Sequence, residues 1–412
     1  MKTPIIIAAT FALCSCGGNQ QKASDPLADS GRTQLTENLL TNLKALGDSS
    51  VYMFGHHDDT VYGIGWQADY LSDSTVHQRS DVRSVCGDFP ALLSFDLGHI
   101  ELGDTLNLDG VPFSRIRQEI LAHYDRGGMV TLSWHLNNPL SGGTSWVADS
   151  LRDVETHTVA AVLEGGERHE QMLAWLDRVA DFLNSLTTPY GVRVPVLFRP
   201  WHEHTGSWFW WGSDHCTPEQ YKALWQLTVS RLRERGVVNA LLAYSPGTEP
   251  DGNAEKYLER YPGDDIIDLM GLDCYCQQCS DNVAADSNAE TPVPVTTLTL
   301  HPSPGVALYM ENLDKNLEMV CNVAREHGKA AALTETGCEG LRTPDWWTHA
   351  LAPVLARHPV SYVLVWRNAH DRPGHFFAPY PGQQSASDFV NFYNLKATLF
   401  LHDLNGLYLS NH

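Results

Sequence analysis

The chain has 412 residues, of which 43% are hydrophobic and 19% are charged, so it can build a large core and is not dominated by disorder. Its formal net charge of -21 argues against nucleic acid or an anionic membrane surface as the ligand, and it suits a neutral substrate such as a polysaccharide. The length fits one large barrel or doubly wound domain, or two smaller domains.

The first residues are typical of a targeting segment. Lys2 precedes an apolar run, Ile5 to Leu13, that is too short to span a bilayer. The run ends in Leu13-Cys14-Ser15-Cys16-Gly17, which resembles the lipobox of bacterial lipoproteins. We therefore expect a signal peptide over residues 1–15 and lipidation of Cys16. This predicts an exported lipoprotein anchored to a membrane, at the cell surface or in the periplasm. A plain cleaved secretory signal is the alternative.

Residues 16–33 are polar, as expected of a flexible tether, and a single catalytic domain is expected over residues 34–412. Leu35 to Leu46 carries leucines at helical spacing and predicts a helix ahead of the barrel. Eight short, β-prone apolar runs follow: Val51–Phe54, Ala91–Phe95, Met129–Trp134, Val194–Phe198, Ala240–Tyr244, Ile266–Leu272, Ala331–Thr334 and Tyr362–Trp366.

Helical patterns or capping signals lie between these runs. The predicted helices are Phe113–Tyr124, His169–Leu186, one from the N-cap Thr217 to Gly236, Glu311–His327, one from Thr343 towards Ala356, and Ala386–Phe400. Apolar strands that alternate with helices favour a parallel sheet, and eight such units favour a (β/α)₈ barrel. The competing doubly wound fold usually has a Gly-rich phosphate turn after its first strand, whereas this chain has Gly55-His56-His57-Asp58-Asp59 there. Two insertions, Leu136–Arg168 and Gln277–Gly305, are expected to wall the active-site cleft.

Polar and aromatic residues follow seven of the eight runs. They are His56, His57 and Asp58; Asp96 and His99; Trp134 and His135; Arg199, His202 and Glu203; Asp273 and Tyr275; Glu335; and Trp366, Arg367 and Asn368. Because the carboxyl ends of barrel strands hold the active site, we expect these groups to converge there. His56, His57 and Asp58 could bind a metal, but a supporting or distal-subsite role is preferred. Trp134 and His135 could instead belong to the core.

The stretch after the fourth run is the most informative. Glu203 stands between two imidazoles, His202 and His204, and a shelf of rings follows at Trp208, Phe209, Trp210 and Trp211. Sugars need flat apolar surfaces beside hydrogen-bonding groups, so this composition predicts a sugar site, with an aromatic core plug as the alternative.

Glycoside hydrolysis needs two carboxylates on either side of the scissile bond, and Glu203 and Glu335 can reach it from opposite sides of a barrel mouth. In a retaining mechanism they lie about 5–5.5 Å apart, so one charge keeps the other group protonated. The alternatives are a structural Glu203 paired with Arg199, and Glu339 in place of Glu335.

RPWHEHTGSWFWWG resembles the signature of family 26 glycoside hydrolases, mostly β-mannanases with a (β/α)₈ barrel and a retaining mechanism. The resemblance runs from about Val51 to Phe400. It implies that Glu203 is the acid/base and Glu335 the nucleophile. It also implies substrate-binding roles for His135 and His202 in the −1 subsite, Trp208 on the leaving-group side, Asp273 and Tyr275 near the nucleophile, and the stacking Trp366 with Arg367.

The resemblance further implies hydrolysis of β-1,4-mannosidic bonds in β-mannan or mannooligosaccharides, with no cofactor and no metal, by a chain expected to be a monomer. His204-Thr205 stands where the family often has Met-Asn. A mixed-linkage β-glucan or β-1,3-xylan remains an alternative substrate, a non-catalytic glycan-binding lipoprotein remains an alternative function, and endo and exo action remain open.

Seven cysteines follow the signal segment: Cys86, Cys216, Cys274, Cys276, Cys279, Cys321 and Cys338. A zinc site at Cys274, Cys276 and Cys279 is disfavoured, because no second Cys/His pair stands nearby and a structural zinc needs four ligands. Buried free thiols or one local disulfide are expected.

Overall fold

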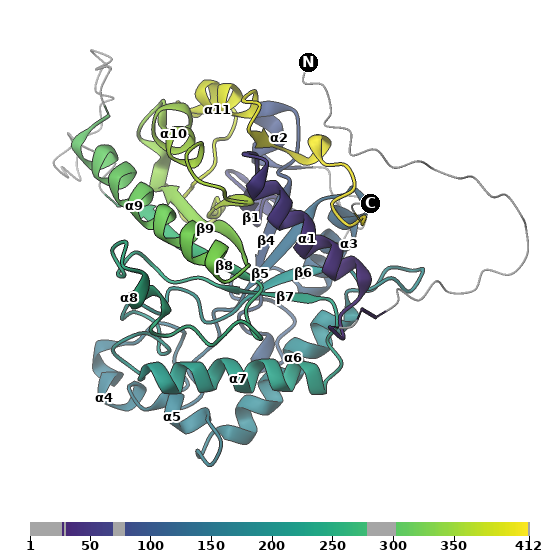
Figure 1. Ribbon diagram of the computed structural model, residues 1–412, viewed down its shortest axis with the longest axis vertical. Helices are drawn as coiled ribbons and strands as arrows, with labels where there is room; N and C mark the ends of the chain where they lie inside the picture. The colour runs from purple at the N-terminus through teal and green to yellow at the C-terminus, as the bar shows by residue number, and fades with distance from the viewer. Residues whose placement is uncertain (1–26, 29, 69–78, 278–301, 411–412) are drawn as a thin grey trace, which may run out of the picture.

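Eight parallel strands close into a barrel in the computed structural model, which describes residues 27–28, 30–68, 79–277 and 302–410 (Figure 1). The strands are β1 (Tyr52–His57), β4 (Leu92–Asp96), β5 (Met129–Ser133), β6 (Val196–Arg199), β7 (Ala240–Tyr244), β8 (Leu269–Cys276), β9 (Ala330–Cys338) and β10 (Tyr362–Val365). Each pairs with the next, and β10 pairs with β1. The predicted (β/α)₈ barrel is confirmed.

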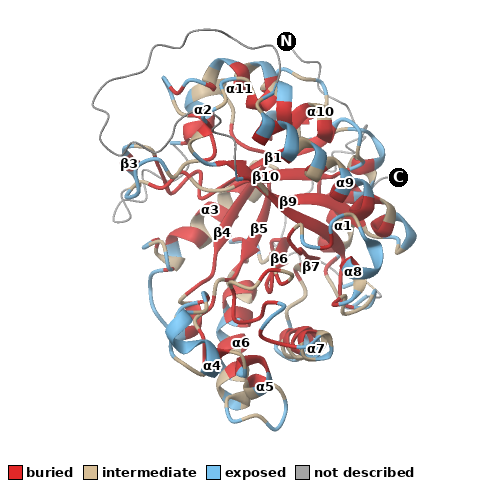
Figure 2. Ribbon diagram, turned by 90° about the vertical axis from the view of Figure 1, so that its left-hand side faces the viewer, coloured by how far each residue is buried: buried red, intermediate tan, exposed pale blue. Residues whose placement is uncertain are grey.

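Helices surround the barrel. They are α1 (Gln34–Asp48), α2 (Asp81–Cys86), α3 (Phe113–Asp125), α4 (Arg152–Glu155), α5 (Thr158–Val162), α6 (His169–Ser185), α7 (Pro218–Glu234), α8 (Ala254–Leu258), α9 (Pro304–Glu326), α10 (Ala352–Leu355) and α11 (Ala386–Tyr393). A small hairpin, β2 (Tyr62–Gly63) and β3 (Trp66–Gln67), follows β1. Figure 2 shows buried strands inside helices that keep one exposed face.

Successive side chains along each strand point alternately into the barrel and away from it, so they form two separate apolar clusters. In β4, Leu92 belongs to the cluster that fills the barrel, whereas Leu93 and Phe95 belong to the cluster under the surrounding helices. The inner cluster continues to Leu39 and Leu43 of α1, so this helix closes one end of the barrel. The opposite end, at the strand C-termini, is left for polar side chains.

The C-terminal segment is fixed to α1 by two buried amides. Asn38 Nδ2 donates to the carbonyl of Tyr408 at 2.9 Å, and Asn42 Nδ2 donates to that of Leu407 at 2.7 Å. The predicted helix before the barrel therefore forms and also holds the end of the domain.

Several element boundaries differ from the sequence prediction. β1, β8 and β9 continue past the apolar runs into the residues expected to follow them. In β8 and β9 the reason is that Arg199 joins Asp273 and Glu335, and Tyr275 donates to Glu335, in the barrel mouth. α9 begins at Pro304 rather than at Glu311, after the N-cap Ser303. α11 ends at Tyr393 instead of Phe400, because Thr398–Leu399 (β11) pairs with β1.

The helix predicted from Thr343 begins later, as a π-helical turn (Trp347–Leu351) that leads into α10. The helix after Thr217 has the expected start: Thr217 and Gln220 form a capping box, and Pro218 occupies the first turn.

The predicted signal peptide, the lipidation site Cys16, most of the tether and residues 278–301 of the second insertion lie outside the described residues. Within the described part of the chain, none of the helices is both long and apolar enough to cross a membrane.

Candidate active site

Glu335 of β9 is held by two donors from neighbouring strands. Arg199 at the end of β6 donates to one carboxylate oxygen, and the hydroxyl of Tyr275 in β8 donates to the other. Arg199 also donates to Asp273 at 2.7 Å, and its side chain is only 1% exposed. The alternative in which a structural Glu203 pairs with Arg199 is therefore wrong. Arg199 instead joins the carboxylates of Asp273 and Glu335.

A β-bulge sets the direction of Glu335. Leu272 pairs with Leu333, but Asp273 pairs with Glu335, so Thr334 is the extra residue. Bulges near active sites re-aim the side chains beside them. The Thr334 hydroxyl donates to Asp273 at 2.8 Å and helps to hold the neighbouring carboxylate.

Glu203 lies in a tight turn after β6. Its backbone N–H donates to the carbonyl of Ser245 at 2.7 Å, which fixes the turn to the end of β7. Trp201 and Glu203 both have left-handed backbone, with φ of 57° and 51°, and such strain persists where surrounding contacts enforce it. The buried Trp201 supplies this constraint, since its carbonyl accepts from Tyr221 at 2.7 Å.

The environment of Glu203 favours its protonated form. Burial, the charge of Glu335 and the charge of Asp273 raise the pKa of Glu203 well above its usual value, against the bond from Trp208. Trp208 Nε1 donates to Glu203 Oε2 at 2.7 Å. Burial and the charge of Glu335 also raise the pKa of Tyr275, so this hydroxyl remains a donor.

The predicted aromatic shelf divides into two parts. Trp208 is half-buried and lines a cavity of about 240 Å³ that also contacts Glu203, Tyr275 and the start of α9. Trp210 and Trp211 are fully buried, and their indoles donate to the carbonyls of Leu136 and His202. The core-plug alternative is correct for these two residues.

The first insertion packs beside the Glu203 turn, as expected of a cleft wall. Trp146 of the insertion forms a β-bridge with Phe209, and Val147 N–H donates to the carbonyl of Trp208 at 2.8 Å. His204 lies between the buried rings of Tyr221 and Tyr244.

Thr205, the other departure from the family pattern, accepts from the N–H of Gly247 at 2.9 Å and donates to Glu249 at 2.5 Å. These two contacts shape the loop after β7.

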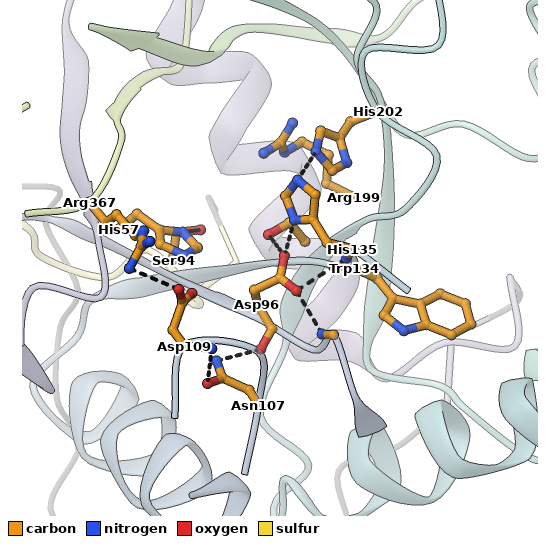
Figure 3. Close-up of polar contacts among 12 residues, drawn as sticks. His57, Ser94, Asp96, Asn107, Asp109, Trp134, His135, Arg199, His202 and Arg367 are labelled. Atoms are coloured by element: carbon orange, nitrogen blue, oxygen red, sulfur yellow. Dashed lines mark hydrogen bonds and ion pairs between the residues drawn. The ribbon is translucent and has the colours of Figure 1, made fainter. Parts of the chain in front are cut away.

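His135 and His202 meet at this site. Their Nε2 atoms are 3.0 Å apart, and His135 Nδ1 lies 2.6 Å from Asp96 Oδ2 (Figure 3). Asp96, which follows the second apolar run, thus belongs to the site. Trp134 does not, because it is fully buried and donates to Glu101 at 3.0 Å. His99 lies at the cap of a short 3₁₀ turn, Ile100–Leu102.

Trp366 and Arg367 lie at the mouth with His57. The Trp366 ring stacks on His57 at 4.1 Å, and Arg367 pairs with Asp109 at 2.8 Å. His56 lies on the other side of β1 and bonds to Asp59 at 2.8 Å, so it does not join the site. Asn368 holds the backbone of Phe377 and Ala378 and has a structural role.

Among the described residues, one cluster has the donors for a metal ion: His57, Asp58 and Asp109, whose ligand atoms lie within 4.8 Å of one another. Arg367 already faces Asp109, and Tyr62 donates to Asp58 at 2.5 Å. Arg367 also donates to the Tyr62 hydroxyl at 3.2 Å, so Asp58 and Asp109 are linked to each other through Tyr62 and Arg367.

Among the described residues, Cys86, Cys216, Cys274, Cys321 and Cys338 are free thiols, and all but Cys86 are buried. Cys276 is disulfide-bonded. Both of the expected kinds of cysteine, free thiols and a disulfide-bonded one, therefore occur, and Cys279 lies outside the described residues.

Sequence reasoning missed Ser245, Asp109 and Ser133. Ser245 donates to Asp273 at 2.7 Å, and Ser133 donates to Asp96 at 2.5 Å. Ser133 is the one small polar residue near the end of the run Met129–Trp134 apart from Thr131, and Ser245 directly follows the run Ala240–Tyr244, so their place near strand ends was the signal available for them. Asp109 lies in a loop far from any strand end in sequence and carried no such signal.

The chain matches the family model for Glycosyl hydrolase family 26 over residues 28–298. A mannan endo-1,4-β-mannosidase of Bifidobacterium adolescentis is 30% identical over 386 residues, which are 89% of this chain and 34% of that relative. A protein of the same name from Bacillus subtilis strain 168 is 30% identical over 216 residues, 50% of this chain and 57% of that relative. The chain therefore spans about a third to about half of the length of these curated relatives.

Solved structures match more of the chain. A family 26 β-mannanase from Bacteroides ovatus is 50% identical with a TM-score of 0.81, and the match covers 92% of this chain and 99% of that one. A modular endo-β-1,4-mannanase from Cellulomonas fimi is 30% identical with a TM-score of 0.75, over 93% of this chain and 79% of that one.

Proposed function

The chain belongs to glycosyl hydrolase family 26, and from this premise we propose that it hydrolyses β-1,4-mannosidic bonds in mannan, galactomannan, glucomannan and mannooligosaccharides with retention of configuration. The observation that carries the proposal is a pair of carboxyl groups in unlike environments. Glu335 accepts from Arg199 and Tyr275, whereas burial and the charge of Glu335 raise the pKa of Glu203. The mannanase names of the relatives support mannan as the substrate.

In the first step, a Glu335 carboxylate oxygen attacks the anomeric carbon while Glu203 gives its proton to the departing glycosidic oxygen. Arg199 and Tyr275 orient the attacking group through both of its oxygens. The products are a glycosyl ester on Glu335 and a free leaving sugar.

In the second step the roles of Glu203 reverse. The negative charge of Glu335 is one of the causes that raise the pKa of Glu203, and ester formation removes that charge. The carboxylate of Glu203, stabilised by the Trp208 indole N–H, then accepts a proton from a water molecule that attacks the anomeric carbon. Two displacements restore the original configuration.

Separate Glu203→Ala and Glu335→Ala variants test the two roles on galactomannan and mannooligosaccharides. Both should lose nearly all turnover. Azide with an activated aryl β-mannoside should give the β-mannosyl azide from Glu203→Ala and the α-mannosyl azide from Glu335→Ala, because azide enters at different steps. Glu339→Gln is the matched control, since Glu339 is 55% exposed and bonds to His375. Wild-type turnover in either alanine variant would refute the roles.

A panel of mannan, mixed-linkage β-glucan and β-1,3-xylan ranks the substrate classes, with mannan expected to react fastest. Binding of mannan without release of reducing ends would favour the glycan-binding alternative. Early products from mannohexaose distinguish the modes of attack: a ladder indicates endo action, and mannobiose alone indicates exo action.

The same proposal includes an exported monomeric lipoprotein whose Cys16 carries the lipid. The lipobox-like sequence supports it. Radiolabelled fatty acid should enter the wild-type protein and not a Cys16→Ser variant. Equal labelling of both would contradict the assignment.

A further inference from the structure

A row of buried polar groups runs across the barrel mouth to the neighbour of Glu203 (Figure 3). It begins at Ser133 at the end of β5, passes through Asp96 at the end of β4 and His135, and ends at His202. The resemblance gives sugar-binding roles to the two histidines, but it gives none to Asp96.

Asp96 accepts four hydrogen bonds. Its Oδ1 accepts from the N–H groups of Gly98 at 2.6 Å and His135 at 3.1 Å. Its Oδ2 accepts from the Ser133 hydroxyl at 2.5 Å and from His135 Nδ1 at 2.6 Å. Burial alone would raise the pKa of Asp96, but the His135 charge and these hydrogen bonds hold it well below its usual value. The carboxylate is therefore ionised, and Nδ1 of His135 carries a proton.

The charges around His135 favour its protonated ring. Six charged or titratable side chains face His135 from four strands and two loops: Asp96, Asp109, Glu335, Arg199, His57 and His202. Burial lowers the pKa of His135, but the charge and hydrogen bond of Asp96, with the charge of Glu335, raise it above its ordinary value. Burial and the charges of Arg199 and His135 lower the pKa of His202, which stays neutral.

The ring–ring hydrogen bond links the two proton positions. When both nitrogens of His135 are protonated, its Nε2–H donates to Nε2 of His202, and the single proton of His202 must sit on Nδ1. His202 Nδ1 has no hydrogen-bond partner among the described residues. The ring that Asp96 holds thereby donates a hydrogen bond to the residue beside the acid/base.

We propose that Asp96 is a positioning residue: its carboxylate holds the proton on Nδ1 of His135 and with it the orientation and positive charge of the ring, whose Nε2–H donates to His202. The proton arrangement follows from these contacts and the charges around them, and only its effect on turnover rests on the proposed function. An Asn at position 96 keeps the shape of the Asp side chain but reverses the direction of its hydrogen bond to His135. Its oxygen must stay with the two backbone N–H groups, so its NH₂ faces His135 Nδ1 and requires that nitrogen to be unprotonated.

The test combines ring-nitrogen NMR with kinetics on the full chain. Histidine labelled with ¹⁵N reports the protonation of each ring nitrogen, and the His135 signals are assigned by their loss in His135→Gln. The wild type should show protons on both ring nitrogens of His135, and Asp96→Asn should lose the proton on Nδ1 and keep the one on Nε2. We expect kcat of Asp96→Asn to fall by roughly 10- to 100-fold, the range known for partners that orient functional histidines. Asp314→Asn, in a partly exposed Asp–His pair on α9, is the control and should retain wild-type kcat.

An unprotonated Nδ1 in the wild type would overturn the inference even if the Asn variant did not fold. A protonated Nδ1 in Asp96→Asn would overturn it as well, and so would a wild-type kcat in a variant that has lost this proton. If the wild type cleaves no mannan, the proposed function fails, while the NMR measurement still decides the proton arrangement.

Discussion

Replacing Trp208 by Phe removes one hydrogen bond from the acid/base and keeps an aromatic ring in the cavity. The indole N–H donates to Glu203 Oε2 at 2.7 Å and favours the carboxylate form, so it lowers the pKa of Glu203 against the effect of burial. A hydrogen bond to a charged group contributes about 1.5–3 kcal/mol, and about 1.4 kcal/mol corresponds to a tenfold change in an equilibrium. Its loss should therefore raise the pKa at which Glu203 loses its proton.

Glu203 must be protonated for the first step, so its ionisation sets the alkaline limb of the kcat/KM profile. In Trp208→Phe that limb should move to higher pH by about one to two pH units. Initial rates on a soluble mannooligosaccharide across the pH range measure it. Trp146→Phe is the control, because Trp146 is a 58% exposed ring on the neighbouring insertion. A limb that stays in place, or moves to lower pH, would refute the reasoning.

Three further substitutions test contacts that stabilise the fold, by urea unfolding. Arg199→Met should cost about 3–5 kcal/mol, because it leaves the buried carboxylates of Asp273 and Glu335 without their cation; Arg231→Met, in a more exposed pair with Asp177, should cost less than about 1 kcal/mol. Asn42→Ala should cost about 1–3 kcal/mol, since the buried Leu407 carbonyl loses its donor. Thr217→Ala removes the N-cap of α7 and should cost about 0.5–2 kcal/mol, and an unchanged midpoint would contradict the capping role.

The architecture follows from the sequence because the barrel strands are nearly all apolar. Buried parallel strands read as continuous apolar runs, and all eight runs are strands of the barrel. The predicted strands stop before the true ends of β8 and β9, because these ends carry polar residues. Asp273, Tyr275 and Glu335 are polar and would end a strand by hydropathy, yet they remain in the ladder because they bond to Arg199 and to each other.

The site was predictable where a residue type has one chemical use at a strand end, as for Glu203 and Glu335. It was not predictable where a role depends on tertiary contacts. The sequence cannot show that Trp210 is buried against Leu136 while Trp208 lines a cavity. Nor can it show that Asp96 accepts four bonds, because three of the four donors belong to Ser133 and His135 at the end of the neighbouring strand, and only the fold brings them to Asp96.

Covalent trapping tests the central claim most directly. A 2-deoxy-2-fluoro-β-mannosyl substrate with an activated leaving group should glycosylate the nucleophile and slow hydrolysis of the resulting ester, so that one glycosyl unit accumulates on the protein. Peptide mapping of the trapped wild type should place the label on Glu335, and Glu335→Gln should take up none. A label on Glu339 or any other residue, or an intact protein mass that never increases while the substrate is consumed, would contradict the assignment of Glu335 as the nucleophile.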